Sequence, residues 1–176
     1  REWLTTLEGA EVDRTAIVSL YLLLVGGVGS AALALPQFAS ARGFDVPRGA
    51  YALLFGLLGL IGFFTVMKLV RLRQAWHDSV KAMSQIKDFY LERFPGLKPA
   101  FRWKTETIPA PGKPWTITFN LALLVALIDS VAIAVAIYFA DLRLPGADYT
   151  AALLAAILFF VWQVWFYFIQ LPLSDR

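Results

Sequence analysis

Residues 115–140 read WTITFNLALLVALIDSVAIAVAIYFA, and the fold prediction starts from this stretch. It carries a single charged side chain, Asp129. A helix needs about 20 apolar residues to cross a hydrocarbon layer about 30 Å thick. A surface helix of a soluble protein would instead carry a charged face along its length. The stretch therefore predicts a transmembrane helix.

Three further apolar blocks of similar length run from about Thr15 to Leu35, from Ala50 to Val70 and from Tyr149 to Leu171. Of the 176 residues 59% are hydrophobic and 16% charged, whereas soluble domains are nearer one half and one quarter. Pro36 and Pro172 mark the predicted ends of the first and last blocks, and short links join the members of each pair. The predicted fold class is all-α, an integral membrane bundle of four transmembrane helices arranged as two hairpins.

The second apolar block continues into a polar sequence without a helix breaker. From Lys68 to Phe94 apolar residues recur every three or four positions, which is a helical period, and most residues between them are charged or polar. We expect one long helix from about Ala50 to Phe94, whose second half is a cytosolic amphipathic helix. Its apolar stripe consists of Leu72, Trp76, Val80, Met83, Ile86 and Tyr90.

The predicted organisation follows from these blocks. It comprises a cytosolic N-terminal segment (1–14), a first transmembrane hairpin (15–70), a basic cytosolic helix with a proline-rich linker (71–115), a second transmembrane hairpin (116–171) and a C-terminal tail (172–176).

Basic residues predict the orientation. The segment from Lys68 to Trp115 holds ten lysine and arginine residues, whereas the two other links hold only Arg42, Arg48 and Arg143. Loops rich in lysine and arginine stay on the cytoplasmic side of a membrane. We therefore expect residues 71–115 and both termini to be cytoplasmic in a multi-pass membrane protein.

The basic amphipathic helix has three interpretations. It can be a topology signal attracted to anionic head groups, each basic residue contributing about 1 kcal/mol near the surface. It can be an interface that covers its apolar stripe with a partner helix. A nucleotide or nucleic-acid site is the third, but no glycine-rich phosphate loop supports it. The expected partners are therefore the bilayer with its anionic head groups and other membrane subunits or further copies of this chain, and not nucleic acid.

Asp129 is the residue most suggestive of function, because an ionisable group near the bilayer centre costs about 2.5–3.5 kcal/mol on insertion scales. It shares a helix face with small residues such as Ala122 and Ala136, so it should face another helix. Depth counting places Ser30 at its level and Gln163 about a turn deeper. Asp129 is then either a proton- or cation-handling carboxyl, or a protonated donor to Ser30, a backbone carbonyl or another subunit.

The sequence lacks the residues that several kinds of catalytic and metal-binding sites require. Cysteine is absent, and the single histidine, His77, is expected on the solvated surface of the basic helix. No zinc-binding histidine pair, nucleophile elbow or dinucleotide fingerprint occurs. We therefore expect no catalytic residues, no metal site, no cofactor and no enzymatic activity.

Two hypotheses for function remain. The first is a non-enzymatic membrane subunit that packs into a larger assembly as an accessory or scaffold component. The alternative is a homo-oligomeric ion channel or pore-forming effector, gated through the cytosolic helix, with Asp129 on its path.

Overall fold

The computed structural model describes residues 2–43, 45–96, 110–140 and 148–171, with side chains described from Arg14 onward and, in the last range, from Tyr149. These ranges form four helices and no strands: α1 (Glu2–Ala41), α2 (Arg48–Arg93), α3 (Ile117–Phe139) and α4 (Asp148–Gln170). All four are long and apolar enough to cross a membrane. The prediction of an all-helical chain with four such helices is confirmed.

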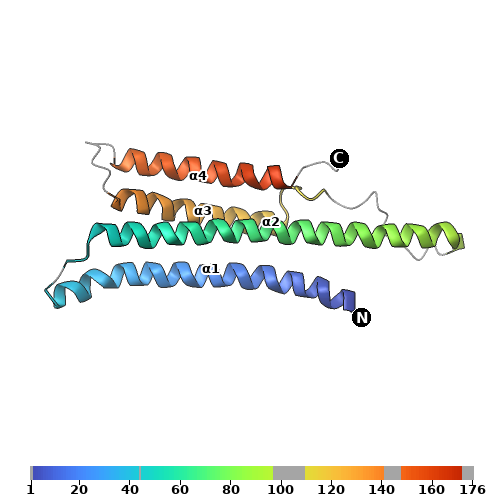
Figure 1. The fold of residues 1–176 in the computed structure, drawn as a ribbon, viewed down its shortest axis with the longest axis horizontal. Coiled ribbons are helices and arrows are strands. Elements are labelled where there is room, and N and C mark those ends of the chain that lie inside the picture. The colour runs from blue at the N-terminus through green and yellow to red at the C-terminus, as the bar shows by residue number, and fades with distance from the viewer. Residues whose placement is uncertain (1, 44, 97–109, 141–147, 172–176) are drawn as a thin grey trace.

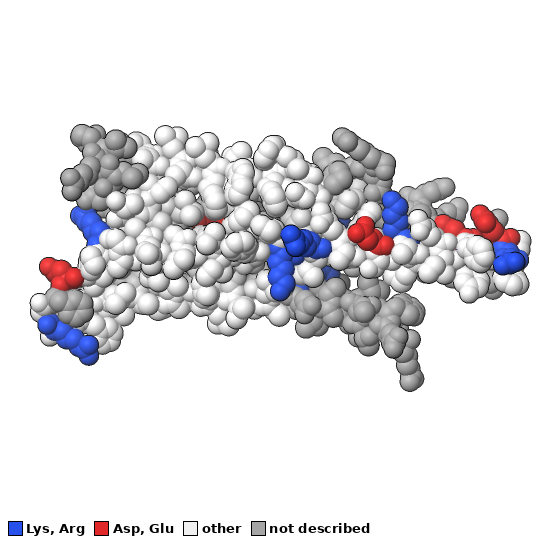
Figure 2. Space-filling model, in the orientation of Figure 1, with Lys and Arg blue, Asp and Glu red and all other residues white. Residues whose placement is uncertain are grey.

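The four helices lie side by side, and α2 extends well past its neighbours (Figure 1). We call the end from which α2 projects the basic end, and residues 71–93 the α2 extension. The start of α1 and the end of α4 lie toward the basic end, and the α1–α2 turn lies at the opposite, hairpin end. Charged side chains gather at the two ends and along the extension, and leave a nearly charge-free band between them (Figure 2).

The long second helix is one continuous element of 46 residues, as the uninterrupted sequence pattern predicts. At ~1.5 Å of rise per residue, its length is about twice the thickness of a hydrocarbon layer. It ends at Phe94, whose backbone N–H donates to the carbonyl oxygen of Tyr90, and Pro95 follows. A proline after the last turn cannot continue the helical hydrogen bonds, which accounts for the stop.

The predicted end of the first span at Pro36 is wrong. Helix α1 contains Pro36 and continues to Ala41, where Arg42 and Gly43 close the turn with hydrogen bonds to Ala39 and Ser40. Proline removes one helical hydrogen bond but leaves the rest, and apolar surroundings penalise any unpaired backbone group. Continuing the helix is therefore favoured over ending it. The last turns of α1 bend away from its axis in Figure 1, as expected beyond a proline.

Helix α3 begins at Ile117, two residues after the predicted stretch begins at Trp115. Thr116 is its N-cap, and the Thr116 hydroxyl accepts a hydrogen bond from the backbone N–H of Phe119 at 3.3 Å. Threonine at this position satisfies one of the donors that a helix start leaves unpaired. The Thr116 side chain therefore sets the boundary.

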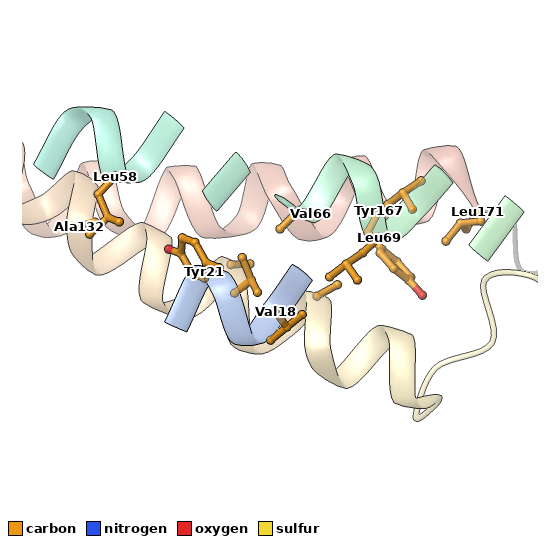
Figure 3. Close-up of a cluster of buried hydrophobic side chains, with 12 residues drawn as sticks. Val18, Tyr21, Leu58, Val66, Leu69, Ala132, Tyr167 and Leu171 are labelled. Carbon is orange, nitrogen blue, oxygen red and sulfur yellow. The ribbon is translucent and has the colours of Figure 1, made fainter. Parts of the chain in front are cut away.

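The core of the bundle lies along α3. Its contact with α2 is the most extensive, that with α4 is next, and α1 packs mainly against α2 without touching α4 among the described residues. Small residues on α3, such as Ala122, Ala126 and Ala132, let the neighbouring helices approach closely. The buried cluster in Figure 3 takes side chains from all four helices: Val18, Tyr21, Leu58, Val66, Leu69, Val70, Ala122, Val125, Ala126, Ala132, Tyr167 and Leu171.

Candidate functional site

Asp129 lies in the middle of α3 and is completely buried, with 0% of its surface exposed. Gln163 of α4, 1% exposed, donates a hydrogen bond from Nε2 to Asp129 Oδ2 at 2.8 Å. The two residues that the sequence singled out on the third and fourth spans are therefore in direct contact. The two side chains are long enough to meet although the sequence places their backbones about one helical turn apart in depth.

Helices α1 and α2 complete the surroundings of this carboxyl group. A Cβ atom built on Gly62 of α2 would overlap the Asp129 carboxyl group and would lie 2.8 Å from the Tyr21 hydroxyl oxygen. Tyr21 is buried and belongs to α1 (Figure 3). Asp129 and Tyr21 therefore converge on one glycine, where only the absence of a side chain leaves room. We call Asp129, Gln163 and Tyr21, together with Gly62, the Asp129 cluster.

Three polar atoms of the Asp129 cluster are buried without a hydrogen-bond partner among the described residues. They are Asp129 Oδ1, Gln163 Oε1 and the Tyr21 hydroxyl. Buried polar atoms are nearly always paired, because an unpaired one loses its hydration without compensation. The cluster thus keeps spare capacity to bind a proton or to accept and donate further hydrogen bonds.

A small cavity of ≈ 10 Å³ lies beside Gln163, between α2, α3 and α4. Its polar lining consists of Gln163 and Tyr167, which stand one helical turn apart on α4. A volume of about 10–15 Å³ suffices for one water molecule if it finds polar partners. The lining is mostly apolar, so such a water would depend on Gln163 Oε1 and on the Tyr167 hydroxyl, which also lies near Thr116.

Arg73 leads from Tyr167 toward the basic end. The Arg73 guanidinium group and the Tyr167 hydroxyl are close enough to interact electrostatically. Arg73 is itself buried, donates from Nε to the Pro111 carbonyl oxygen at 3.2 Å, and lies 4.5 Å from the ring centre of Trp76. A charged group is therefore held near the basic end of the bundle by a carbonyl and an aromatic face.

Ser30 does not take part, contrary to the predicted partnership with Asp129. It is exposed on α1, which contributes Tyr21 to the cluster instead. The depth count assumed that the first span ends at Pro36, whereas α1 reaches Ala41 and its Arg14 donates to Thr118 Oγ1 at 2.8 Å. This hydrogen bond places Arg14 level with the start of α3, so that Ser30 lies well past Asp129 toward the hairpin end. The sequence did not single out Tyr21, because a tyrosine in an apolar block is far less unusual than a carboxyl group.

The predicted stripe on the α2 extension divides into two parts. Its first four members, Leu72, Trp76, Val80 and Met83, are half-buried, whereas Ile86 and Tyr90 are 59% and 52% exposed. His77 is buried, so the expectation of a solvated histidine is wrong. The reason is helical spacing: His77 continues the bundle-facing side of α2 that holds Val70 and Arg73.

No protein-family model, curated protein or solved structure matches this chain. Within residues that the structure describes, no group of three or more His, Cys, Asp or Glu side chains could hold a metal ion.

Proposed function

We propose that this chain is a non-enzymatic integral membrane subunit that packs into a larger membrane assembly through the α2 extension. The observation that carries the proposal is the far end of that extension. There Ile86, Phe89, Tyr90 and Phe94, which we call the tip patch, are each more than half exposed. They lie beyond the bundle, on the part of α2 that has no neighbouring helix in Figure 1.

The tip patch has the spacing of a helix-docking surface. Ile86, Tyr90 and Phe94 follow each other at intervals of four, and Phe89 lies three after Ile86. Anchors at such spacing fit a second amphipathic helix laid along the same face. Contiguous exposed apolar surface outside the membrane band marks a protein interface or a membrane contact. A partner helix covers the whole patch, because it can follow the extension away from the bundle.

The orientation is part of the same proposal. Lys68 and Arg71 are exposed where the apolar part of α2 gives way to the extension, and blue side chains stand at this point in Figure 2. Their position suits contact with anionic head groups. The basic end, with residues 71–115 and both termini, is then cytoplasmic, in line with the excess of lysine and arginine there.

The alternative, a homo-oligomeric ion channel with Asp129 on its path, has less support. Copies arranged around a pore line it with residues from their outward faces. Asp129 and Gln163 are instead enclosed between α1, α2, α3 and α4 of one chain. A path through each single bundle would have to run through the packed α2–α3 contact.

The test is the mass and composition of the assembly extracted from its own membrane in native nanodiscs. A stoichiometric complex with other chains is the expected result. A closed ring that contains only this chain would contradict the accessory-subunit proposal and favour the channel.

A further inference from the structure

Buried polar side chains are distributed unevenly about Asp129. In the described part of the chain they are Thr65, Arg73, His77, Thr118, Ser130 and Gln163 besides Asp129 itself. Ser130 is adjacent to Asp129, and its hydroxyl is already bonded to the Ala126 carbonyl oxygen at 2.6 Å. All the others lie between Asp129 and the basic end, as does the buried hydroxyl of Tyr167, while the Tyr21 hydroxyl lies level with Asp129 at Gly62.

The half of the bundle toward the hairpin end is apolar by contrast. Beyond Asp129 the α2–α3 contact consists of Gly59 against Ile133 and Gly56 against Ala136. At its end the rings of Tyr51 and Phe139 stack with centres 4.9 Å apart. Between Asp129 and these rings the α2–α3 contact offers a proton no carrier, because the side chains of Ile133 and Ala136 are hydrocarbon and the glycines have none.

We propose that Asp129 is a reversible proton-binding site that exchanges with water at the basic end only, through Gln163, the adjoining cavity and Tyr167. The geometry supplies each link. Gln163 contacts the carboxyl group and lines the cavity, Tyr167 lines the same cavity one helical turn further along α4, and Arg73 interacts electrostatically with Tyr167. The inference is independent of the proposed assembly role.

Binding is a protonation that leaves no by-product other than water. A hydronium ion at the basic end gives up its proton, which passes along the cavity to Gln163 Oε1. Gln163 Nε2 releases a proton to Asp129 Oδ2, where the O–H bond forms, and the Gln163 side chain then returns to its amide form as the proton on Oε1 is exchanged back to the nitrogen. The titratable and charged groups that face the path are Tyr21 and Arg14 from α1, Arg73 from α2 and Tyr167 from α4; among the described residues the α3 face contributes none besides Asp129 itself.

Infrared difference spectroscopy tests the site directly. The purified chain in lipid nanodiscs is titrated with acid, and the stretching band of a protonated carboxyl group is followed. We expect a band that grows reversibly with falling pH and is missing from Asp129→Asn. Should that variant fail to fold, Asp129→Glu identifies the band by shifting its frequency. A band that does not change with pH, or that survives Asp129→Asn, would overturn the proposal.

Sidedness and route need vesicles with separately controlled inner and outer pH. We expect the band to follow the pH at the basic end, and Tyr167→Phe to slow the response several-fold while Tyr138→Phe leaves it unchanged. Tyr138 is the matched control, since it sits at the hairpin end of α3. A response to the pH at the hairpin end would contradict the proposal. So would equal rates in both variants, or a response to sodium chloride at constant pH, which would indicate a cation site.

Discussion

At the scale of the residue, Gln163 is the donor that makes the burial of Asp129 tolerable. The carboxyl group is fully enclosed, and its hydrogen bond from Gln163 partly replaces the hydration it loses. The same hydrogen bond ties α4 to α3 at mid-length. Removing one member should therefore cost more than removing both.

We expect Gln163→Leu to lower the free energy of unfolding by about 1–3 kcal/mol, because it leaves a buried acceptor unpaired. Asp129→Leu combined with Gln163→Leu should restore much of this loss. Thermal unfolding in one detergent, followed by circular dichroism, gives both values. Gln37→Leu is the matched control, since Gln37 is exposed on α1. Strictly additive losses in the double variant would show that the two side chains are not coupled.

Gly62 should tolerate no side chain. We expect Gly62→Ala to destabilise the chain by about 1–3 kcal/mol, the usual effect of overpacking, because the added methyl group meets both Asp129 and Tyr21. The control is Gly26→Ala on α1, where a Cβ would meet nothing within 4 Å. There the better helix propensity of alanine should leave stability equal or slightly higher. Similar midpoints for the two variants would refute the close contact at Gly62.

The sequence predicts part of the Asp129 cluster and misses the rest for physical reasons. A carboxyl group in an apolar helix and an amide a turn away in depth are conspicuous, so Asp129 and Gln163 could be found. Tyr21 could not, because tyrosine is common near span ends and depth alone does not say which way its ring points. Ser30 was predicted at the wrong depth because the count ended the first span at Pro36, whereas α1 continues to Ala41.

At the scale of the element, α2 joins a membrane-length helix to an exposed apolar surface. The continuity was predictable, because no breaker interrupts the pattern between Ala50 and Arg93. Which stripe residues remain free was not, since periodicity gives a face but not its neighbours. The structure half-buries Trp76 and Met83 and leaves Ile86 and Tyr90 open. Substitutions that test the proposed docking of a partner should therefore be made in the tip patch.

We expect Ile86→Ser combined with Tyr90→Ser to release the chain from its assembly while the chain itself stays folded. The two substitutions remove exposed apolar surface that the proposed partner would cover. Native mass measurement after extraction shows whether the complex persists. The matched control is Lys81→Ser combined with Glu92→Ser, on the opposite face of α2 and likewise without change in net charge. Equal retention of partners by both pairs would exclude the tip patch as the interface.

At the scale of the whole molecule, the bundle is built around the α2–α3 contact, with α1 and α4 as flanking helices. Hydropathy predicts how many helices there are, but it is silent on which of them touch. Lipid is as apolar as a leucine side chain, so close packing and hydrogen bonds decide the contacts. The glycines of α2 and alanines of α3 provide that packing, and α1, the least buried of the four spans, remains largely open.

The proposed orientation can be read out with single cysteines, because the natural chain contains none. We expect Gln85→Cys, exposed on the α2 extension, to react with a membrane-impermeant maleimide only from the cytoplasmic side. Ser40→Cys, exposed near the end of α1, should react only from the other side. Labelling of intact and then opened cells distinguishes the two. Labelling of both cysteines from one side would contradict four crossings, and the reverse pattern would invert the topology.

The unbroken course of α2 has one more consequence. Gly62 and Ile86 belong to the same rigid rod, about 36 Å apart along its axis at ~1.5 Å per residue. A continuous helix with an intact hydrogen-bond ladder resists internal twisting, so it transmits a rotation about its axis from one end to the other. Any rotation imposed on α2 where it presses against Asp129 turns the tip patch through the same angle. For the same reason, a partner that binds the tip patch and rotates α2 would change the contact between Gly62 and the Asp129 carboxyl group.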